Sequence, residues 1–225
     1  MPKKRDVCFC SWSGGKDSCL ALFRSLNSGM QPRVLLTMLT EAGERSRSHG
    51  LPVSLLKQQA SSLGMRLITR KTSWDDYEAN FLDEANRLRE EGISVGVFGD
   101  IDLEQHREWV ERVCAKADMK AVLPLWKSNR DDLLTEFLSS GFKATVVSVK
   151  EGVLDSAFLG RSLTAAVIKD MKLAGIDACG EEGEYHTFVT DGPVFSKPVE
   201  VLQRCVHLRD GYWYLDLDAP ATGPL

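Results

Sequence analysis

The stretch Val7-Cys8-Phe9-Cys10-Ser11-Trp12, followed by Ser13-Gly14-Gly15-Lys16-Asp17-Ser18, decides the fold of this chain. Its first six residues form a short apolar run flanked by polar residues, which is typical of a buried strand. Apolar residues from Cys19 to Leu26 then recur at steps of three and four, which predicts a helix that ends near Gly29. The glycine turn thus lies between a strand and a helix, where parallel α/β sheets bind phosphate.

Strands and helices continue to alternate up to about residue 126. Predicted strands are Val34–Leu39, Arg66–Arg70, Ile93–Phe98 and Ala121–Leu125, and amphipathic helices begin near Pro52, Trp74 and Trp109. Helices of this length between strands imply crossover connections, hence a parallel sheet. We therefore predict an α/β fold with a doubly wound, five-stranded parallel sheet that binds ligands at the carboxyl ends of its strands.

The pattern changes after Trp126, where a smaller α+β domain is expected. Asn129 can cap a helix, Ala144–Val149 reads as a strand, and Leu163–Lys172 as a helix. The chain then becomes β-rich, and Asp210-Gly211 is typical of a hairpin turn. We predict a phosphate-binding domain over residues 1–126 and a substrate-binding domain over residues 127–225.

The composition is that of an ordinary globular protein. Of the 225 residues 43% are hydrophobic and 27% charged, and the net charge of -4 makes nucleic acid an improbable main partner. The six cysteines include no CxxC pair, so we interpret them as reduced thiols. No apolar run reaches the roughly 20 residues of a membrane span, and the charged start does not resemble a signal peptide. We expect a cytoplasmic protein.

The residue types of the glycine turn suit a nucleotide phosphate. Two glycines let the backbone approach phosphate oxygens, while hydroxyl groups and a lysine add donors and charge. A carboxylate beside phosphates needs a cation between them, which favours Mg²⁺. The GxxxxGK[ST] spacing of a Walker A loop is absent. The predicted nucleotide-binding residues of this turn, called the phosphate loop below, are Ser13, Gly14, Gly15, Lys16, Asp17 and Ser18.

Two other segments are expected near the phosphate loop. Gly99-Asp100 follows the fourth strand, so Asp100 should lie at the same sheet edge as Asp17 and face the same crevice; capping of the next helix is the alternative. Arg47, His49 and Gly50 follow the second strand, where they would bind substrate or form a solvated loop.

An unusual acidic segment runs from Gly180 to Thr187. Glu181, Glu182 and Glu184 crowd together, so a metal, an amine or backbone N–H groups should compensate their charge. If the chain is extended there, Glu184 and His186 share one face, and Tyr185 and Thr187 the other. A Glu/His pair could act in acid–base chemistry or bind a metal, whereas a solvated acidic loop is the bland alternative.

Together these segments resemble a known family. Ser13–Ser18 resembles the PP-loop of the N-type ATP pyrophosphatases, and Phe98–Ile101, Pro124–Trp126 and Cys179–Phe188 resemble the diphthine–ammonia ligases. The resemblance implies ATP and Mg²⁺ as cofactors, adenylation of a carboxylate with loss of pyrophosphate, and amidation by ammonia. The acceptor it implies is diphthine, a modified histidine of elongation factor 2, and it admits a homodimer.

The resemblance also distributes roles. Residues assigned to catalysis are Lys16, Asp17, Glu181, Glu184 and His186. Gly99 and Asp100 join the phosphate loop in cofactor binding, with Asp17 and Asp100 as metal ligands. Residues assigned to the substrate are Arg47, His49, Gly50, Arg161, Glu182, Tyr185 and Thr187.

The chain departs from the family pattern at two positions. It has His186 where the family usually has Glu, and Glu182 where it usually has Gly. A related branch with His at this position is associated with cobalamin salvage, so the same chemistry on a small-molecule acid is the first alternative. A tRNA-modifying PP-loop enzyme and a non-catalytic nucleotide-binding protein are the others.

Overall fold

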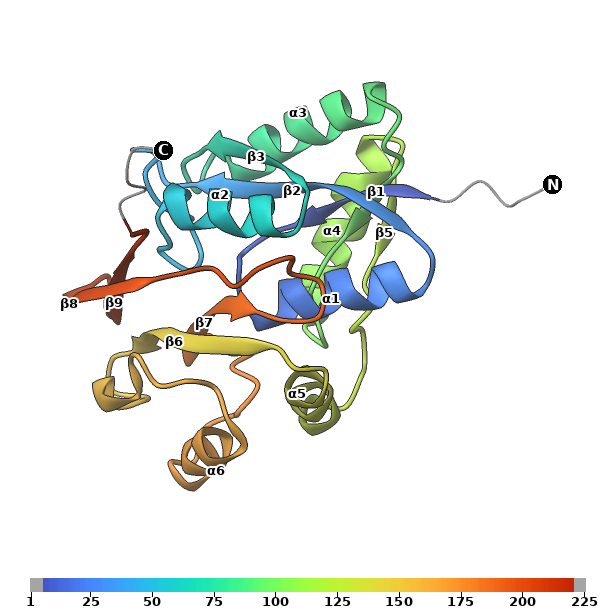
Figure 1. Ribbon diagram of the computed structural model, residues 1–225. Helices are drawn as coiled ribbons and strands as arrows, with labels where there is room; N and C mark the ends of the chain where they lie inside the picture. The colour runs from blue at the N-terminus through green and yellow to red at the C-terminus, as the bar shows by residue number, and fades with distance from the viewer. Residues whose placement is uncertain (1–5, 221–225) are drawn as a thin grey trace. The chain divides into compact units, whose positions relative to one another are not determined.

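Two β-sheets of different kinds organise the chain (Figure 1). The computed structural model describes residues 6–220, which divide into two units. Unit 1 comprises Met1–Ser13, Asp17–Arg47 and Gly64–Asn129, as far as they are described. Unit 2 comprises Gly14–Lys16, Ser48–Leu63 and Arg130–Leu225, with the same restriction. The domain limits at residue 126 stay a prediction.

Unit 1 contains the predicted parallel sheet. Its strand order is β3-β2-β1-β4-β5 and every pairing is parallel, so the fold class is confirmed. The strands are β1 (Val7–Ser11), β2 (Gln31–Leu39), β3 (Arg66–Lys71), β4 (Val95–Val97) and β5 (Lys120–Val122). The helices are α1 (Lys16–Asn27), α3 (Tyr77–Glu90) and α4 (Glu104–Lys116). Figure 1 shows α1 and α3 on opposite sides of the sheet, as double winding requires.

Unit 2 is built on an antiparallel sheet with the order β7-β6-β9-β8. Its strands are β6 (Lys143–Lys150), β7 (Tyr185–Asp191), β8 (Leu202–Arg209) and β9 (Tyr212–Asp218). Its helices are α2 (Val53–Ser62), α5 (Arg130–Ser139), the short η1 (Ser156–Phe158) and α6 (Ala165–Leu173). The hairpin predicted at Asp210-Gly211 is confirmed, and both residues have positive φ (51° and 76°), as a type I′ turn requires.

The helix predicted from Trp74 begins later. α3 starts at Tyr77, because Ser73 to Asp76 form a turn in which the Ser73 hydroxyl accepts the Asp76 N–H. Trp74 therefore lies outside the helix with 69% of its surface exposed, instead of leading the buried face. A helical repeat of apolar residues predicts which side chains are buried only where the chain is helical.

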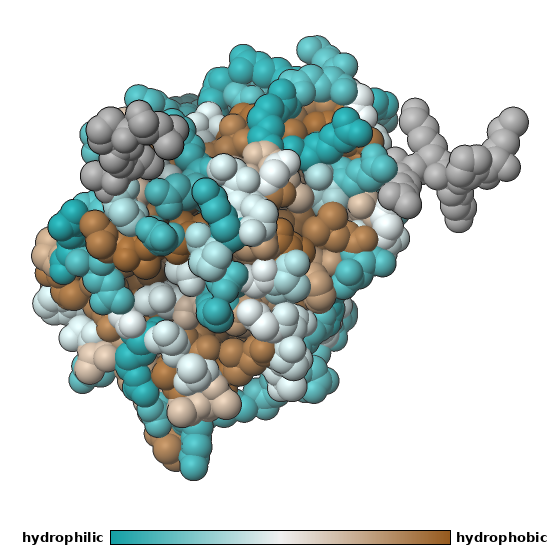
Figure 2. Space-filling model, viewed as in Figure 1, coloured by the Kyte–Doolittle hydropathy of each residue, from teal (hydrophilic) through white to brown (hydrophobic). Residues whose placement is uncertain are grey.

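Hydrophobic residues at the surface are limited in the described part of the chain. Figure 2 shows brown patches interrupted by hydrophilic residues, and Leu202, Val206 and Leu208 of the edge strand β8 are among the exposed large ones. Among residues 6–220, no helix has the length and apolarity needed to cross a membrane.

Aromatic rings fill the space between the parallel sheet and the α3–α4 layer. Phe81 of α3 is 1% exposed and lies 6.1 Å from Phe9, 6.2 Å from Phe98 and 5.2 Å from Trp109, measured between ring centroids. These four rings join β1, the end of β4 and both helices. Phe81 thus fixes the helical layer against the strands whose carboxyl ends carry the predicted site.

We expect Phe81→Ala to lower the free energy of unfolding by about 3–5 kcal/mol, because the void left by the ring cannot be refilled by rigid neighbours. Urea unfolding followed by circular dichroism measures this change. Trp74→Ala is the aromatic control, and its exposed ring should contribute within about 0.5 kcal/mol. Equal losses for the two variants would contradict the assignment of Phe81 to the core.

Candidate active site

The phosphate loop is bonded to the outer edge of β7. The Val189 N–H donates to the Gly14 carbonyl at 2.9 Å, and the Lys16 N–H donates to the Thr187 hydroxyl at 3.0 Å. Because β7 is the first strand of its sheet, its outer backbone groups have no neighbouring strand. Gly14–Lys16 takes the place of that strand. The structure thereby brings Gly14–Lys16 to the segment Tyr185–Thr187.

Two side chains complete this edge. Gln59 of α2 is 0% exposed, and its Nε2 donates to the Gly14 carbonyl at 3.0 Å and to the Val189 carbonyl at 2.7 Å. His49 Nδ1 lies 3.0 Å from the Thr187 carbonyl. A Cβ atom on Gly15 would lie 2.4 Å from His49 Cε1, so only glycine allows the loop and the imidazole to approach this closely.

His49 and His186 form a stacked pair of neutral rings. Their centroids are 4.4 Å apart with an interplanar angle of 27°. Burial lowers the pKa of His49 to about 4, the Lys16 charge adds to this, and the Thr187 carbonyl opposes it. Burial also lowers the pKa of His186 well below its usual value, aided by His49 and Lys16. At neutral pH both imidazoles therefore offer lone pairs without charge.

The positive charge of this region comes from Lys16. Its side chain is 6% exposed, and its Nζ lies 5.5 Å from the centroid of the Tyr185 ring, on whose face a cation is stabilised. The Tyr185 hydroxyl donates to the Ala178 carbonyl at 2.7 Å, so the ring cannot turn away. Tyr185 and Thr187 share one face of β7, which confirms the alternation expected for an extended segment.

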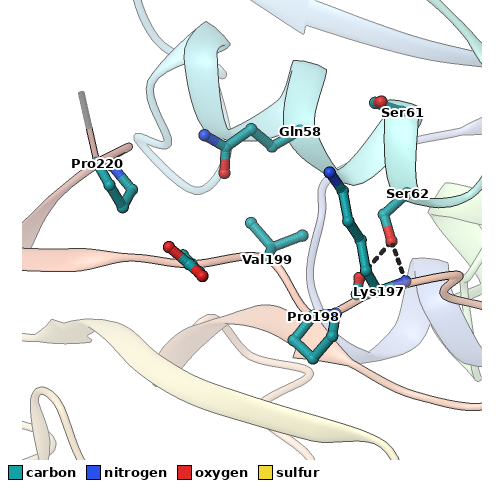
Figure 3. A pocket seen from close by; sticks show the side chains of 8 residues that line it. Gln58, Ser61, Ser62, Lys197, Pro198, Val199 and Pro220 are labelled. Atoms are coloured by element: carbon teal, nitrogen blue, oxygen red, sulfur yellow. Dashed lines mark hydrogen bonds between the residues drawn. The ribbon is translucent and has the colours of Figure 1, made fainter. Parts of the chain in front are cut away.

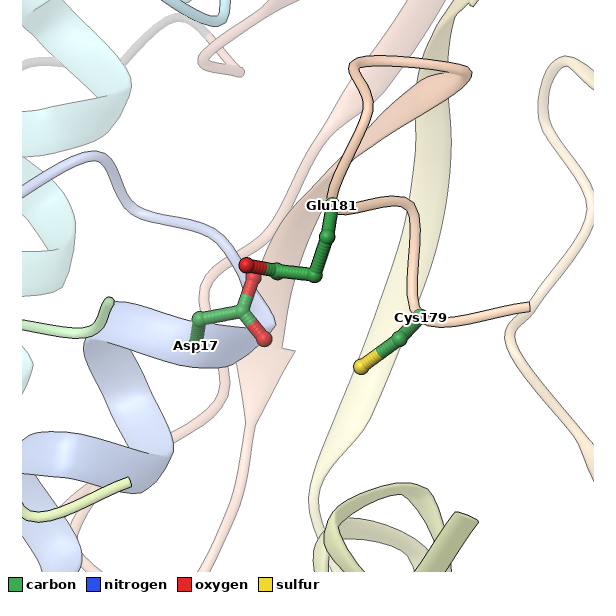
Figure 4. A group of neighbouring side chains, drawn as sticks. All are labelled: Asp17, Cys179 and Glu181. Carbon is green, nitrogen blue, oxygen red and sulfur yellow. The ribbon is translucent and has the colours of Figure 1, made fainter. Parts of the chain in front are cut away.

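The carboxylates of the acidic segment before β7 lie in different surroundings. Glu184 is 7% exposed, and its Oε2 accepts the Glu182 N–H at 3.0 Å, so this carboxylate is turned onto its own loop. Figure 4 shows Glu181 and Cys179 on the loop that leads into β7. Backbone N–H groups thus compensate part of the crowded charge, one of the solutions expected from the sequence.

The unit 1 residues of the site lie together at the carboxyl edge of the parallel sheet. The Ser13 hydroxyl donates to the Ser18 hydroxyl at 3.1 Å across the loop. A Cβ atom on Gly99 would lie 3.0 Å from the Asp17 carbonyl carbon, so the end of β4 touches the start of α1. Asp100 follows directly, and its Oδ1 lies 3.2 Å from His106 Nδ1.

Asp17 and Asp100 suit a hard cation. Both are carboxylates, the ligand type that Mg²⁺ prefers, and the contact of Gly99 with the Asp17 backbone joins the two segments that carry them. Burial raises the pKa of Tyr77 to about 12, and the negative charge of Asp100 adds to this effect. The tyrosine next to this edge therefore stays protonated at neutral pH.

The two arginines predicted to bind substrate contact other residues of the protein. The Arg47 guanidinium stacks over the Trp74 ring at 4.3 Å and donates to the Thr72 carbonyl at 2.8 Å. Arg161 pairs with Asp170 of α6 and lies over the Phe158 ring. Their roles in substrate binding stay predictions.

A separate pocket in unit 2 contains none of the predicted residues. Gln58, Ser62, Lys197 and Pro198 are among the residues that line it (Figure 3). The Ser62 hydroxyl bonds the backbone of Lys197, which closes one wall. The predicted site residues therefore lie outside this hollow.

Sequence reasoning missed Gln59. It lies in an amphipathic helix without any motif, and only its complete burial marks it, because a buried amide must find partners. Its two partners are 45 and 130 residues away in the chain. A pattern of neighbouring residues cannot contain such a signal.

We expect the stability of the protein to fall as the pH is lowered from about 6.5 towards 4. The unfolded His49 binds a proton near pH 6.5 and the folded one only near 4, so the unfolded state gains protons first and is favoured. The loss at pH 5 should be about 1–2 kcal/mol for this residue. Urea unfolding at pH 7 and pH 5 measures it, and His49→Gln should reduce the difference. An unchanged difference would contradict the assignment.

Comparison with known proteins agrees with this geometry. The family model for the diphthamide synthase N-terminal domain matches residues 7–121, and that for the diphthamide synthase C-terminal domain matches residues 129–218. A human protein named diphthine–ammonia ligase is 30% identical, with 89% of this chain and 85% of the relative covered. A zebrafish (Danio rerio) protein of the same name is 27% identical, with 89% of both chains covered. This chain belongs to the diphthamide synthase family.

Proposed function

We propose that this protein is a diphthine–ammonia ligase, which uses ATP to convert the carboxylate of diphthine into the amide of diphthamide. The observation that carries the proposal is the bonding of Gly14–Lys16 to β7, which joins the phosphate loop to Tyr185–Thr187. The names of the matched relatives support the same activity. They give no support to a small-molecule acid, a tRNA or a purely nucleotide-binding role.

In the first step a carboxylate oxygen of the acceptor attacks the α-phosphorus of ATP. The bond from this phosphorus to the bridging oxygen breaks, and pyrophosphate leaves from an acyl-adenylate. The phosphate loop supplies hydroxyl and backbone donors from Ser13 to Ser18, and Lys16 supplies a charge. Preorganised donors of this kind stabilise the negative charge that develops on the leaving group.

Mg²⁺ would be held by Asp17 and Asp100, and when bound it offsets charge on the pyrophosphate oxygens. The support is the close approach of Gly99 to the Asp17 backbone, which brings both carboxylate-bearing segments to one sheet edge. Glycine at position 99 allows this approach because it has no side chain.

In the second step ammonia attacks the acyl carbon and AMP leaves. The neutral His186 ring can accept a hydrogen bond from ammonia, and we assign Glu181 and Glu184 to the same acceptor region, with Glu181 as the base that takes the released proton. Glu184 acts by shaping the loop, because its carboxylate accepts the Glu182 N–H. His49, Gly50, Tyr185 and Thr187 line the acceptor beside the loop.

The acceptor residue would be presented by elongation factor 2. We propose that three charged residues contact this partner: Arg47, Arg161 and Glu182. A homodimer is a further proposal, which light scattering of the purified protein tests directly through its mass in solution.

We expect Lys16→Ala to lower pyrophosphate release at least about 100-fold, because a preorganised charge at the developing pyrophosphate is lost. The assay contains ATP, ammonium and elongation factor 2 that carries diphthine. Lys172→Ala, at the end of α6, is the control and should keep the wild-type rate. Release that is independent of the acceptor, or equal in Lys16→Ala, would contradict the proposal.

The metal assignment predicts a separate effect. Asp17→Asn removes one carboxylate charge and should raise the Mg²⁺ concentration at half-maximal rate by about tenfold, while saturating Mg²⁺ restores part of the activity. EDTA should stop the wild-type reaction. Asp118→Asn, an exposed aspartate paired with Arg89, is the control. A Mg²⁺ dependence that is the same in all three proteins would exclude Asp17 as a ligand.

A further inference from the structure

One carboxylate organises the loop that carries Glu181. Asp177 precedes this loop, and its Oδ1 accepts the Cys179 N–H at 3.0 Å, while its Oδ2 accepts the Glu181 N–H at 3.2 Å. The Asp177 carbonyl accepts a third bond, from the Gly180 N–H at 3.0 Å. A single residue thus accepts three backbone N–H groups within four positions. It fixes the path of the chain at the residue proposed to act as base.

Asp177 is itself held by a helix. The Arg130 Nη1 at the start of α5 lies 2.7 Å from the same Oδ2 that accepts the Glu181 N–H. Both side chains are partly buried, with 30% of Arg130 and 23% of Asp177 exposed. Charge-assisted hydrogen bonds of this kind are stronger than neutral ones. The loop is therefore tied to a rigid element and not to another loop.

Two further groups of this segment are anchored to its backbone. The Glu184 carboxylate is bonded to the Glu182 N–H, and the Tyr185 hydroxyl to the Ala178 carbonyl. Both of these groups are nearly buried. Asp177 and Glu184 thus bond backbone groups of the loop at its two ends. Figure 4 shows the Glu181 side chain extending from the loop.

We propose that Asp177, held by Arg130, is a positioning residue that sets the place of the Glu181 carboxylate for amide formation. The inference rests on the proposed function for its reaction. Asp177 acts only through Glu181 and touches neither ATP nor acceptor. Removing it should therefore affect the catalytic step, while the phosphate loop keeps its affinity for ATP.

The kinetic test compares Asp177→Ala, Asp177→Asn and Arg130→Met. Misplacing a catalytic group by about 1 Å costs up to roughly 100-fold in rate, so Asp177→Ala should lower kcat by about 10- to 100-fold and leave KM for ATP within about twofold. Asp177→Asn keeps one acceptor oxygen and should lose less. Arg130→Met leaves both backbone bonds and should lose least. A wild-type kcat in Asp177→Ala, or a loss confined to KM for ATP, would overturn the proposal.

A double-mutant cycle tests the route of the effect. If Asp177 acts through Glu181, adding Asp177→Ala to Glu181→Gln should reduce kcat little further. If the two losses multiply instead, Asp177 acts independently and the proposal is wrong. Should Asp177→Ala fail to fold, the same cycle is run with Asp177→Asn.

Asp191→Asn is the matched control. Asp191 also pairs with a cation, Lys143 at 2.8 Å, also accepts a backbone N–H, that of Gly192, and is 22% exposed. It lies at the far end of β7 from the acidic loop, so kcat should stay at the wild-type value. A loss equal to that of Asp177→Asn would show that any carboxylate anchor in this unit matters.

A second readout separates this proposal from the proposed function. Hydrogen exchange of the Cys179 and Glu181 amides should be faster in Asp177→Ala than in wild type, and unchanged in Asp191→Asn. This outcome is expected even if the wild-type protein releases no pyrophosphate with any acceptor. In that case the proposed function fails, whereas the anchoring of the loop by Asp177 stands. Unchanged exchange of both amides would refute the anchoring of the loop by Asp177.

Discussion

The hydrogen bonds between Gly14–Lys16 and the outer edge of β7 are the constraint on which the rest of the site depends. An edge strand has a row of backbone groups that need partners, and a phosphate-binding loop needs a fixed shape. Each requirement is met by the other when the Val189 N–H bonds Gly14 and the Thr187 hydroxyl accepts the Lys16 N–H. Gly14–Lys16 and β7 are thereby parts of one hydrogen-bonded unit.

The same edge explains why its polar side chains are uncharged. Gln59 and neutral His49 satisfy backbone carbonyls without bringing charge into a region where Lys16 is already buried. A charged imidazole would add repulsion to the cost of burial, and the lowered pKa of His49 expresses both effects.

The acidic loop solves the opposite problem, an excess of negative charge. Its carboxylates are given different surroundings: Asp177 and Glu184 accept backbone N–H groups, and Arg130 offsets one of them. Like charges close together cannot all remain unpaired at low cost. The identical residue type of Glu181, Glu182 and Glu184 conceals these different surroundings in the sequence.

Local patterns determined much of this protein. The alternation of apolar runs and helical repeats predicted the parallel sheet, the phosphate loop after β1 and the hairpin at Asp210-Gly211, because each depends on residues close in the chain. The start of the third helix near Trp74 was predicted wrongly, since the turn at Ser73 interrupts the repeat. Only the tertiary structure decided that Gln59 bridges Gly14 and Val189, that His49 stacks on His186, and that Asp177 and Glu184 are the carboxylates that bond the backbone of the acidic loop. These contacts join residues far apart in sequence, or depend on which of several identical groups is buried, and neither property is written in local spacing.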